Sequence, residues 1–392
     1  MLPRTLTGTL RRLAAAFPIV AITGPRQSGK TTLARAVFAD KPYVSLENPA
    51  ELAFAEEDPR GFLARFPQGA IFDEAQRWPA LFSWLQGMVD EDRQPGRYVL
   101  TGSQQFSLLA GITQSLAGRV AITQLLPLSL AELSGAANPV TELDRLLLTG
   151  GYPALHAQSV VAQDWFPSYV ATYVERDVRQ VMNVQDLSTF QRFLRLCAAR
   201  SGQLLNLAAL AGEAGISQGS ARAWLSVLES SYLVHRLPPY HRNFGKRLVK
   251  SPKLYFLDVG LACWLLGITS AEMLALHPLR GALFETWVVG EFVKARFNAG
   301  QPANLYFWRD NNGLESDLLF EVDGRVQPVE IKSGQTITPD YIRAGQKAGR
   351  IAGEEALTPW LIHGGAESYE RSGVRVMSWR SLTETVEKLK LA

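Results

Sequence analysis

The stretch GPRQSGKT, residues 24–31, constrains the fold of this chain more than any other. It follows a short apolar segment, residues 19–22, and leads into a helical pattern, TLARAVF, so that a strand, a glycine-rich loop and a helix follow one another. The pattern G-x-x-x-x-G-K-[ST] in this context is typical of a loop that wraps its backbone around phosphates. The amide hydrogens and the dipole at the start of the helix favour a bound anion.

The loop therefore predicts an ATP site with Mg²⁺. Lys30 is expected to reach the β and γ phosphates, and Thr31 is expected to ligate the metal. The residues expected to contact the nucleotide are those of the loop and the first turn of the helix: Gly24, Pro25, Arg26, Gln27, Ser28, Gly29, Lys30, Thr31 and Thr32.

Three later segments supply candidates for the hydrolysis step. The strand in GAIFDEAQ ends at Asp73 and Glu74, which are expected to hold Mg²⁺ through water and to deprotonate the attacking water, respectively. The strand in RYVLTGSQQF ends near Ser103, a candidate sensor of the γ phosphate, with Thr101 the poorer choice and a simple turn at Gly102 the alternative. Arg119, in LAGR, is a candidate for stabilising charge on the transferred phosphoryl group, although a solvated arginine is the competing interpretation.

Strands and helices alternate over residues 15–130, which predicts an α/β domain with a parallel sheet and helices on both faces. A chain of 392 residues exceeds one ordinary domain, and we expect a P-loop ATPase domain at 1–135, a helical region at 136–255 and a third domain at 256–392. The net charge of +3 permits nucleic-acid binding without arguing for it.

Two observations bear on location. Cys197 and Cys263 share no metal-ligand spacing, so neither a zinc site nor a disulfide framework is expected, and a reducing cytoplasm fits. No uninterrupted apolar stretch reaches the roughly 18 residues of a membrane span, since LYFLDVGLACWLLGI is broken by Asp258. We therefore expect no membrane partner.

The middle region predicts a helix-turn-helix followed by a wing. A turn at Gly215 and a cap at Ser217 precede a second helix, which would present Gln218, Ser220, Arg222 and Ala223 to a DNA groove. The run that follows carries basic and aromatic side chains suited to a phosphate backbone: Arg236, Tyr240, Arg242, Phe244, Lys246, Arg247, Lys250 and Lys253. Such modules also serve as protein-contact surfaces or spacers, and both interpretations stay open.

Earlier in the same region, the segment SYVATYVERDVRQVMNV has helical spacing with charged residues opposite its apolar side. A solvated helix face is the simpler interpretation. Arg176 is a secondary candidate for contacting a nucleotide, in the same chain or in a neighbour.

The C-terminal region predicts a restriction-endonuclease-like α/β domain. A helix carries Glu285 and Glu291, and a β-hairpin turning at Asp323-Gly324 carries the spacing D-x₁₂-E-x-K over residues 317–332. Asp317 and Glu330, with Glu285, are expected to ligate a Mg²⁺ for phosphodiester hydrolysis, and Lys332 to position or activate water. The alternative is a structural remnant whose acids pair with Lys332 and Arg309.

As a whole the chain resembles prokaryotic AAA-type ATPases that carry a C-terminal domain known as DUF4143. The resemblance rests on GPRQSGKTTLA, IFDEAQ, VLTGSQ, SLAGR, ERDV, SPKLYFLDVGLACWL, GALFETWVVGEF, YFWRD and VEIKSG. It implies ATP binding, and the similarity of that tail to PD-(D/E)xK nuclease folds supports the assignment of its four candidate residues. In one departure, Ser316 and Leu318 flank Asp317 where the family usually has EIDF or EVDF.

Two functions follow as hypotheses. The first is an ATP-dependent enzyme that processes duplex or branched DNA with a nuclease-like tail. The second is a regulatory switch in which ATP changes the engagement of a partner protein or operator DNA, with the tail as an inactive docking module and with nucleotide-dependent homo-oligomers. A small-molecule kinase fits worst, because no acceptor-binding region is evident beyond the phosphate-loop domain.

Overall fold

The computed structural model describes residues 2–103, 112, 115–135, 140–158, 160–174, 186–240, 250–309, 314–353 and 356–387. Its first part is a five-stranded sheet in the order β2-β3-β4-β1-β5. The strands are β1 (Ile19–Thr23), β2 (Tyr43–Ser45), β3 (Ile71–Asp73), β4 (Tyr98–Thr101) and β5 (Val120–Gln124). All neighbouring strands run parallel, so their carboxyl ends meet at one edge of the sheet.

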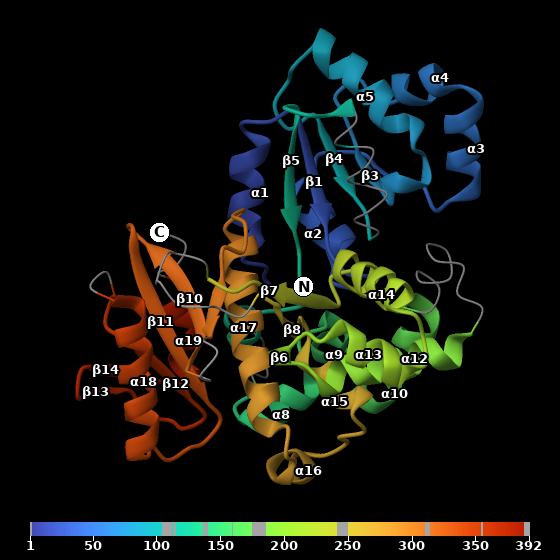
Figure 1. Cartoon of the computed structure of the whole chain (residues 1–392). Helices are drawn as coiled ribbons and strands as arrows, with labels where there is room; N and C mark the ends of the chain where they lie inside the picture. Colours follow the sequence, from blue (N-terminus) through green and yellow to red (C-terminus); the bar gives the residue numbers. More distant parts are fainter. Residues whose placement is uncertain are drawn as a thin grey trace.

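Helices cover both faces of this sheet, as predicted (Figure 1). They are α1 (Leu6–Ala14), α2 (Lys30–Val37), α3 (Pro49–Glu57), α4 (Pro59–Ala64) and α5 (Ala80–Glu91), with a short 3₁₀ turn η1 (Ala75–Arg77). The alternation along β1 explains the two faces: Ile19 and Ala21 pack in one hydrophobic core, which holds side chains of α4 and α5, while Val20 and Ile22 pack in another with α1 and α2.

The middle of the chain is mostly helical. It contains α7 (Leu130–Ser134), α8 (Leu143–Thr149), α9 (Pro153–Ala157), α10 (Ala162–Tyr169), a π-helical turn η2 (Val170–Val174), α12 (Leu187–Ala199), α13 (Leu207–Ala214), α14 (Gln218–Ser230), α15 (Val259–Leu265) and α16 (Ala271–Leu276). The strands β6 (Gln203–Leu204), β7 (Val234–Leu237) and β8 (Lys253–Phe256) form an antiparallel sheet in the order β6-β8-β7.

Within this region α13 and α14 form the predicted helix-turn-helix pair. Gly215 ends α13 in the left-handed conformation at φ 76°, and the Ser217 side chain accepts a hydrogen bond from the Ser220 amide to cap α14. The predicted domain boundary after residue 255 falls inside β8, and α15 packs against α8 and α12. We therefore propose that the middle unit extends past residue 255 to the end of α16.

The C-terminal part is a mixed sheet in the order β13-β14-β12-β11-β10-β9. Its elements are α17 (Arg280–Asn298), β9 (Tyr306–Arg309), β10 (Glu315–Val322), β11 (Arg325–Lys332), α18 (Pro339–Ala352), β12 (Trp360–His363), β13 (Tyr369–Arg371), β14 (Val374–Ser378), η4 (Trp379–Ser381) and α19 (Leu382–Glu387). The predicted hairpin turn joins β10 to β11, with positive φ at both Asp323 and Gly324.

Helix α17 lies between these parts (Figure 1). It contacts β5 and α1 of the first part, β8 and α15 of the middle and β11 of the tail. Most of its residues are buried, as expected of a helix that is surrounded by other elements. No helix among the described residues combines the length and the apolar character that crossing a membrane requires.

Candidate functional site

The phosphate loop forms at the carboxyl edge of the parallel sheet, between β1 and α2, as predicted. Gly24 follows β1 with φ 146°, and a Cβ at that position would lie 2.2 Å from the Leu125 carbonyl oxygen. Gly29 has φ 91° and precedes Lys30, the first residue of α2. Both positions therefore favour glycine, because a side chain would strain the backbone, and at Gly24 it would also collide with the residue that follows β5.

Lys30, Thr31 and Asp73 come together at this edge. The buried Lys30 ammonium donates to the carbonyls of Gly24 and Pro25 at 3.0 and 2.8 Å. The Thr31 hydroxyl donates to both Asp73 carboxylate oxygens at 3.0 Å. A hydroxyl and a carboxylate in this relation form a hard-oxygen site of the kind Mg²⁺ prefers.

Two further hydroxyls hold Asp73. Tyr43 donates to it at 2.8 Å, and Thr101 donates from the end of β4. Burial and the neighbouring Asp73 raise the pKa of Tyr43 to about 12, so the phenol keeps its proton for this hydrogen bond at neutral pH. The sequence considered Thr101 only as a phosphate sensor, and its contact shows that it orients Asp73.

Glu74 follows Asp73 in an unusual backbone conformation, with φ 55°. Its carboxylate accepts a hydrogen bond from the Ser103 hydroxyl at 2.9 Å and another from the Gln76 amide. Ser103 is buried just after β4, so the structure brings together two residues that the sequence singled out separately. Glutamate in a left-handed conformation costs free energy, and such strain is typical of functional sites.

Arg119 does not reach this site. It precedes β5 at the amino edge of the sheet, where its carbonyl pairs with the Ile19 amide, whereas the phosphate loop lies at the carboxyl edge. Its guanidinium makes two 2.7 Å hydrogen bonds to Asp90 on α5. The predicted role at the phosphates of the same chain is therefore not supported, since the length of β5 separates the two places. Arg176 lies outside the described residues.

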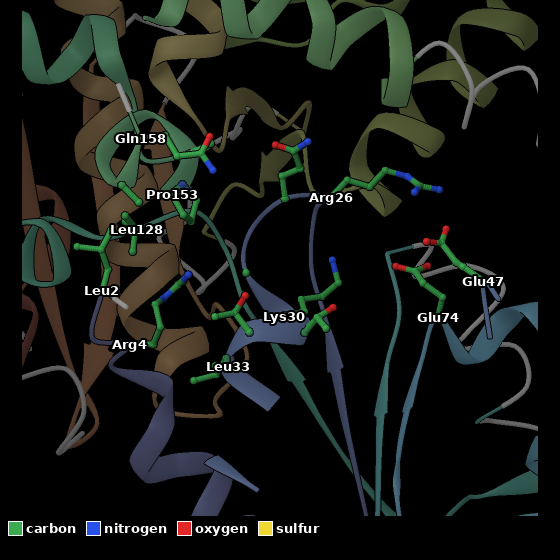
Figure 2. A pocket seen from close by; sticks show the side chains of 16 residues that line it. Leu2, Arg4, Arg26, Lys30, Leu33, Glu47, Glu74, Leu128, Pro153 and Gln158 are labelled. Carbon is green, nitrogen blue, oxygen red and sulfur yellow. The ribbon is translucent and has the colours of Figure 1, made fainter. Parts of the chain in front are cut away.

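A cavity of about 600 Å³ opens above the loop. Figure 2 shows Leu128, Pro153 and Gln158 on one side of Lys30, with Glu47 and Glu74 on the other. The sequence predicted the loop and Glu74 but missed the wall formed by α9 and the chain start, whose residues include Leu2, Arg4, Pro153, Ala154, Ala157 and Gln158. These residues carry no local motif, and only the fold brings them to the loop.

The predicted DNA-facing residues divide into two groups. Gln218 and Arg222 on α14 are exposed, while Ser220 and Ala223 are partly buried. In the basic run, Arg236 and Lys250 are exposed, whereas Tyr240 and Lys253 are buried. The Tyr240 hydroxyl donates to Glu321 at 2.7 Å, so this ring is not available for DNA. Arg242, Phe244, Lys246 and Arg247 lie outside the described residues.

In the tail, Lys253 occupies the centre of the predicted metal site. Its side chain is only 4% exposed, and its ammonium lies 3.0 Å from Glu285 and 3.9 Å from Asp317, with Glu315 also in contact. The Tyr255 hydroxyl donates to the same Glu285 oxygen at 2.6 Å. The acids of β10 and α17 are thus bound to an ammonium that β8 supplies.

The remaining members of the predicted site are also paired. Lys332 lies 2.6 Å from Glu330 and 3.8 Å from Asp317, and the Ile331 amide donates to Asp317 at 2.8 Å. Arg309 pairs with Glu315 at 3.1 Å. In the part of the chain that the structure describes, no group of three His, Cys, Asp or Glu residues is arranged to hold a metal ion. The Mg²⁺ site of Glu285, Asp317 and Glu330 therefore stays a prediction, and in the structure the ammoniums of Lys253 and Lys332 contact these acids.

Glu285 and Glu330 in this cluster have raised pKa values. Burial and the charge of Asp317 raise the pKa of Glu285 to about 7 and that of Glu330 to about 8, although Lys253 and Lys332 oppose the shifts. The pKa of Lys332 is raised, because its acidic neighbours outweigh the effect of burial. The cluster lines a cavity of about 540 Å³ together with residues 202–204.

Comparison with known families and proteins agrees with this architecture. Residues 16–134 match the family described as AAA domain (AAA_14), residues 140–272 a domain of unknown function (DUF8612), and residues 280–382 a domain of unknown function (DUF4143). The match to the middle family ends at residue 272 and the match to the tail family begins at residue 280, which agrees with a middle unit that continues beyond β8.

Two mycobacterial proteins are similar over most of their length. "Uncharacterized protein Rv2008c" of Mycobacterium tuberculosis and "Uncharacterized protein Mb2031c" of Mycobacterium bovis are each 36% identical over 349 residues, which span 88% of this chain and 76% of theirs. Among solved structures, a Walker-type ATPase of Pyrococcus abyssi is similar with a TM-score of 0.47 and 15% identity, over 68% of this chain and 96% of that one. The phosphate loop, its acidic partners and the tail thus place the chain in one group: it belongs to the AAA-type P-loop ATPases that carry a C-terminal DUF4143 domain.

Proposed function

We propose that this protein binds ATP with Mg²⁺ in the cavity above the phosphate loop and hydrolyses it there. The observation that carries the proposal is the convergence of two pairs, Thr31 with Asp73 and Glu74 with Ser103, beside Lys30. Each pair joins residues from different strands or loops. A chance glycine-rich turn would not bring a candidate metal-binding pair, Thr31 and Asp73, and a candidate general base, Glu74, to the same edge of the sheet.

The residues divide the work as follows. Lys30 and the loop amides bind the β and γ phosphates, while Thr31 and Asp73 hold the metal, which neutralises charge on those phosphates when it is bound. Glu74 orients the attacking water and takes its proton, and Ser103 fixes the carboxylate for that role. The apolar side chains of Leu128 and Pro153 lie on the side of the loop opposite Glu74, where they would pack against the adenine ring of ATP (Figure 2).

The test is ATP binding and turnover by the full chain. Lys30→Ala should weaken ATP binding at least about tenfold, because it removes the cation that contacts the transferred phosphate. Lys347→Ala, which removes an exposed lysine from α18, is the matched control and should bind ATP as the wild type does. Calorimetry that registers no heat when ATP and Mg²⁺ are added to the wild type would refute the proposal.

We propose further that the protein uses ATP turnover to process DNA. The middle region has the order of a winged helix, α12-β6-α13-α14-β7-β8, and α14 exposes Arg222. The Tyr232 hydroxyl, just after α14, makes a 2.7 Å hydrogen bond with Thr23, the residue before Gly24. This contact links the helix-turn-helix region to the end of β1, the strand that leads into the phosphate loop, and coupling between nucleotide and DNA needs such a link.

A panel of linear, forked and four-way DNA tests this step. DNA should raise the ATPase rate of the wild type, and Tyr232→Phe should lower the ratio of the stimulated to the unstimulated rate. Arg222→Gln should weaken DNA binding and reduce its salt dependence, whereas Arg371→Gln, on the exposed strand β13, should not. A rate that no DNA in the panel changes would favour the second candidate.

The second candidate is an ATP-driven switch whose tail docks a partner. The specific observation in its favour is Lys253, which joins β8 of the middle region to the acids of the tail. An ammonium in that place suits a structural module better than a metal-dependent nuclease. Light scattering with a non-hydrolysable ATP analogue would reveal a nucleotide-dependent change of oligomeric state, which the switch predicts.

A further inference from the structure

Arg4 is a buried arginine directly behind the phosphate loop. It precedes α1 and its side chain is only 6% exposed. Its three nitrogens have three different acceptors: Nε donates to Glu132 at 3.1 Å, Nη1 to the Ser28 carbonyl at 2.6 Å, and Nη2 to the Leu126 carbonyl at 2.5 Å. A Cβ on Gly29 would lie 3.7 Å from Nη1, so the guanidinium also lies against the backbone of the loop.

The Ser28 carbonyl explains why a donor is needed there. In a phosphate loop the amide hydrogens point towards the bound anion, so carbonyl oxygens point away from it, into the protein. A buried carbonyl without a donor costs free energy, and the direction of the peptide depends on finding one. Arg4 supplies that donor to Ser28, one residue before Gly29.

Glu132 fixes the guanidinium from the other side. Its carboxylate accepts from the Thr5 amide at 2.7 Å and from the Ser129 amide at 2.9 Å, in addition to Arg4. Glu132 also completes the capping box at the start of α7. The carboxylate is thus held by two parts of the chain that are more than a hundred residues apart, and the ion pair has little freedom to move.

Helix α17 holds the same segment from a third direction. Glu291 accepts from the Leu130 amide at 2.7 Å, and Lys294 donates to the Leu128 carbonyl at 3.0 Å. Glu291 and Lys294 also pair with each other at 2.8 Å, and both are buried. The anchor for Arg4 is therefore rigid, because α7 cannot shift without breaking buried charged contacts.

We propose that Arg4 is a positioning residue of the nucleotide site, which sets the peptide of Ser28 so that the loop amides face the phosphates. The inference rests on the proposed ATP binding. A planar guanidinium reaches Glu132, Ser28 and Leu126 at once, whereas a lysine ammonium at this place would be a single compact donor group. Arg4 is also one of the residues that line the cavity.

The experiment compares Arg4→Lys and Glu132→Gln with Arg11→Lys, a matched change at an exposed position of α1. Calorimetry gives the dissociation constant for ATP with Mg²⁺, steady-state kinetics separate KM from kcat, and melting temperatures are measured without nucleotide. Arg4→Lys should raise both the dissociation constant and KM about tenfold, with kcat at saturating ATP within about twofold. Glu132→Gln should change these quantities in the same direction by less, and Arg11→Lys should match the wild type.

Each outcome decides a separate question. If the wild type and Arg11→Lys bind no ATP, the proposed function fails. If both bind ATP and Arg4→Lys binds it equally well, the inference about Arg4 is wrong while the function stands. A strong fall of the melting temperature without nucleotide in both test variants would also overturn the inference, because Arg4 would then stabilise the fold instead of the loop.

Discussion

Replacing Lys253 with methionine should destabilise the protein strongly. The substitution keeps most of the buried aliphatic stem but removes the ammonium from between Glu285, Glu315 and Asp317. Two of these acids keep other partners, because Glu315 pairs with Arg309 and Asp317 accepts from the Ile331 amide. Glu285 keeps the Tyr255 hydroxyl and loses the ammonium that pairs with it. Breaking a buried ion pair in this way costs about 3–5 kcal/mol.

The cost should depend on pH, since Glu285 can take up a proton. Burial and Asp317 already raise its pKa to about 7 with Lys253 present, and loss of the ammonium raises it further. Near pH 8 the variant must either bury an unpaired carboxylate or spend free energy on protonating it, at about 1.4 kcal/mol per pH unit. Near pH 6 Glu285 is mostly protonated, and the destabilisation should be smaller.

Urea unfolding of the wild type, Lys253→Met, Glu285→Gln and the double variant measures these effects at both pH values. The double variant should recover much of the stability that Lys253→Met loses, because it removes the unpaired charge together with its partner. Lys250→Met changes an exposed lysine three positions earlier and should have little effect. A cost below about 1 kcal/mol for Lys253→Met, or a double variant as unstable as the sum of its singles, would refute the reasoning.

Three further predictions concern the two sites. Glu74→Gln should keep ATP binding but lower the turnover rate at least about a hundredfold, because the amide cannot accept a proton from water; unchanged turnover would remove Glu74 from the mechanism. Since the pKa of Glu330 rises from 4.5 to about 8 on folding, the folded state retains a proton between these values that the unfolded state has lost. The free energy of unfolding of the wild type should therefore fall as pH rises through this window, and urea titrations should show a weaker fall for Glu330→Gln. An equal dependence on pH in the two proteins would contradict this reasoning. Mn²⁺ without nucleotide should not raise the melting temperature through the tail, because lysine ammoniums already contact its acids; a rise that Asp317→Asn abolishes would support the predicted metal site.

The candidate nucleotide site was largely predictable because its parts are local patterns at the ends of parallel strands in one sheet. A strand followed by a glycine-rich loop fixes Lys30 and Thr31. An acid at the carboxyl end of another parallel strand of the same sheet must lie at the same edge, which places Asp73. The same rule of direction could have placed Arg119 correctly. It stands before its strand, and the amino ends of parallel strands lie at the opposite edge.

Other features depend on packing between distant segments, which the sequence alone does not reveal. Lys253 belongs to a basic run whose composition indicates an exposed surface. In the structure it is buried, and its partners are Glu285 and Glu315 on elements later in the chain. Arg4 and Tyr232 carry no motif, although both touch the phosphate loop or the strand before it. The hairpin at Asp323-Gly324, by contrast, follows from the turn chemistry of two adjacent residues and was predicted.

Helix α17 contacts both the first part and the middle region, so a chain shortened before this helix would lose buried contacts in both. One part of the helix holds Leu128 and Leu130 beside the nucleotide cavity through Glu291 and Lys294, and another offers Glu285 to Lys253. A chain cut after residue 279 would leave a buried amide, a buried carbonyl and a buried ammonium without those contacts. Helix α17 is thus an internal brace between the first part and the tail, and the two regions are expected to unfold as a unit.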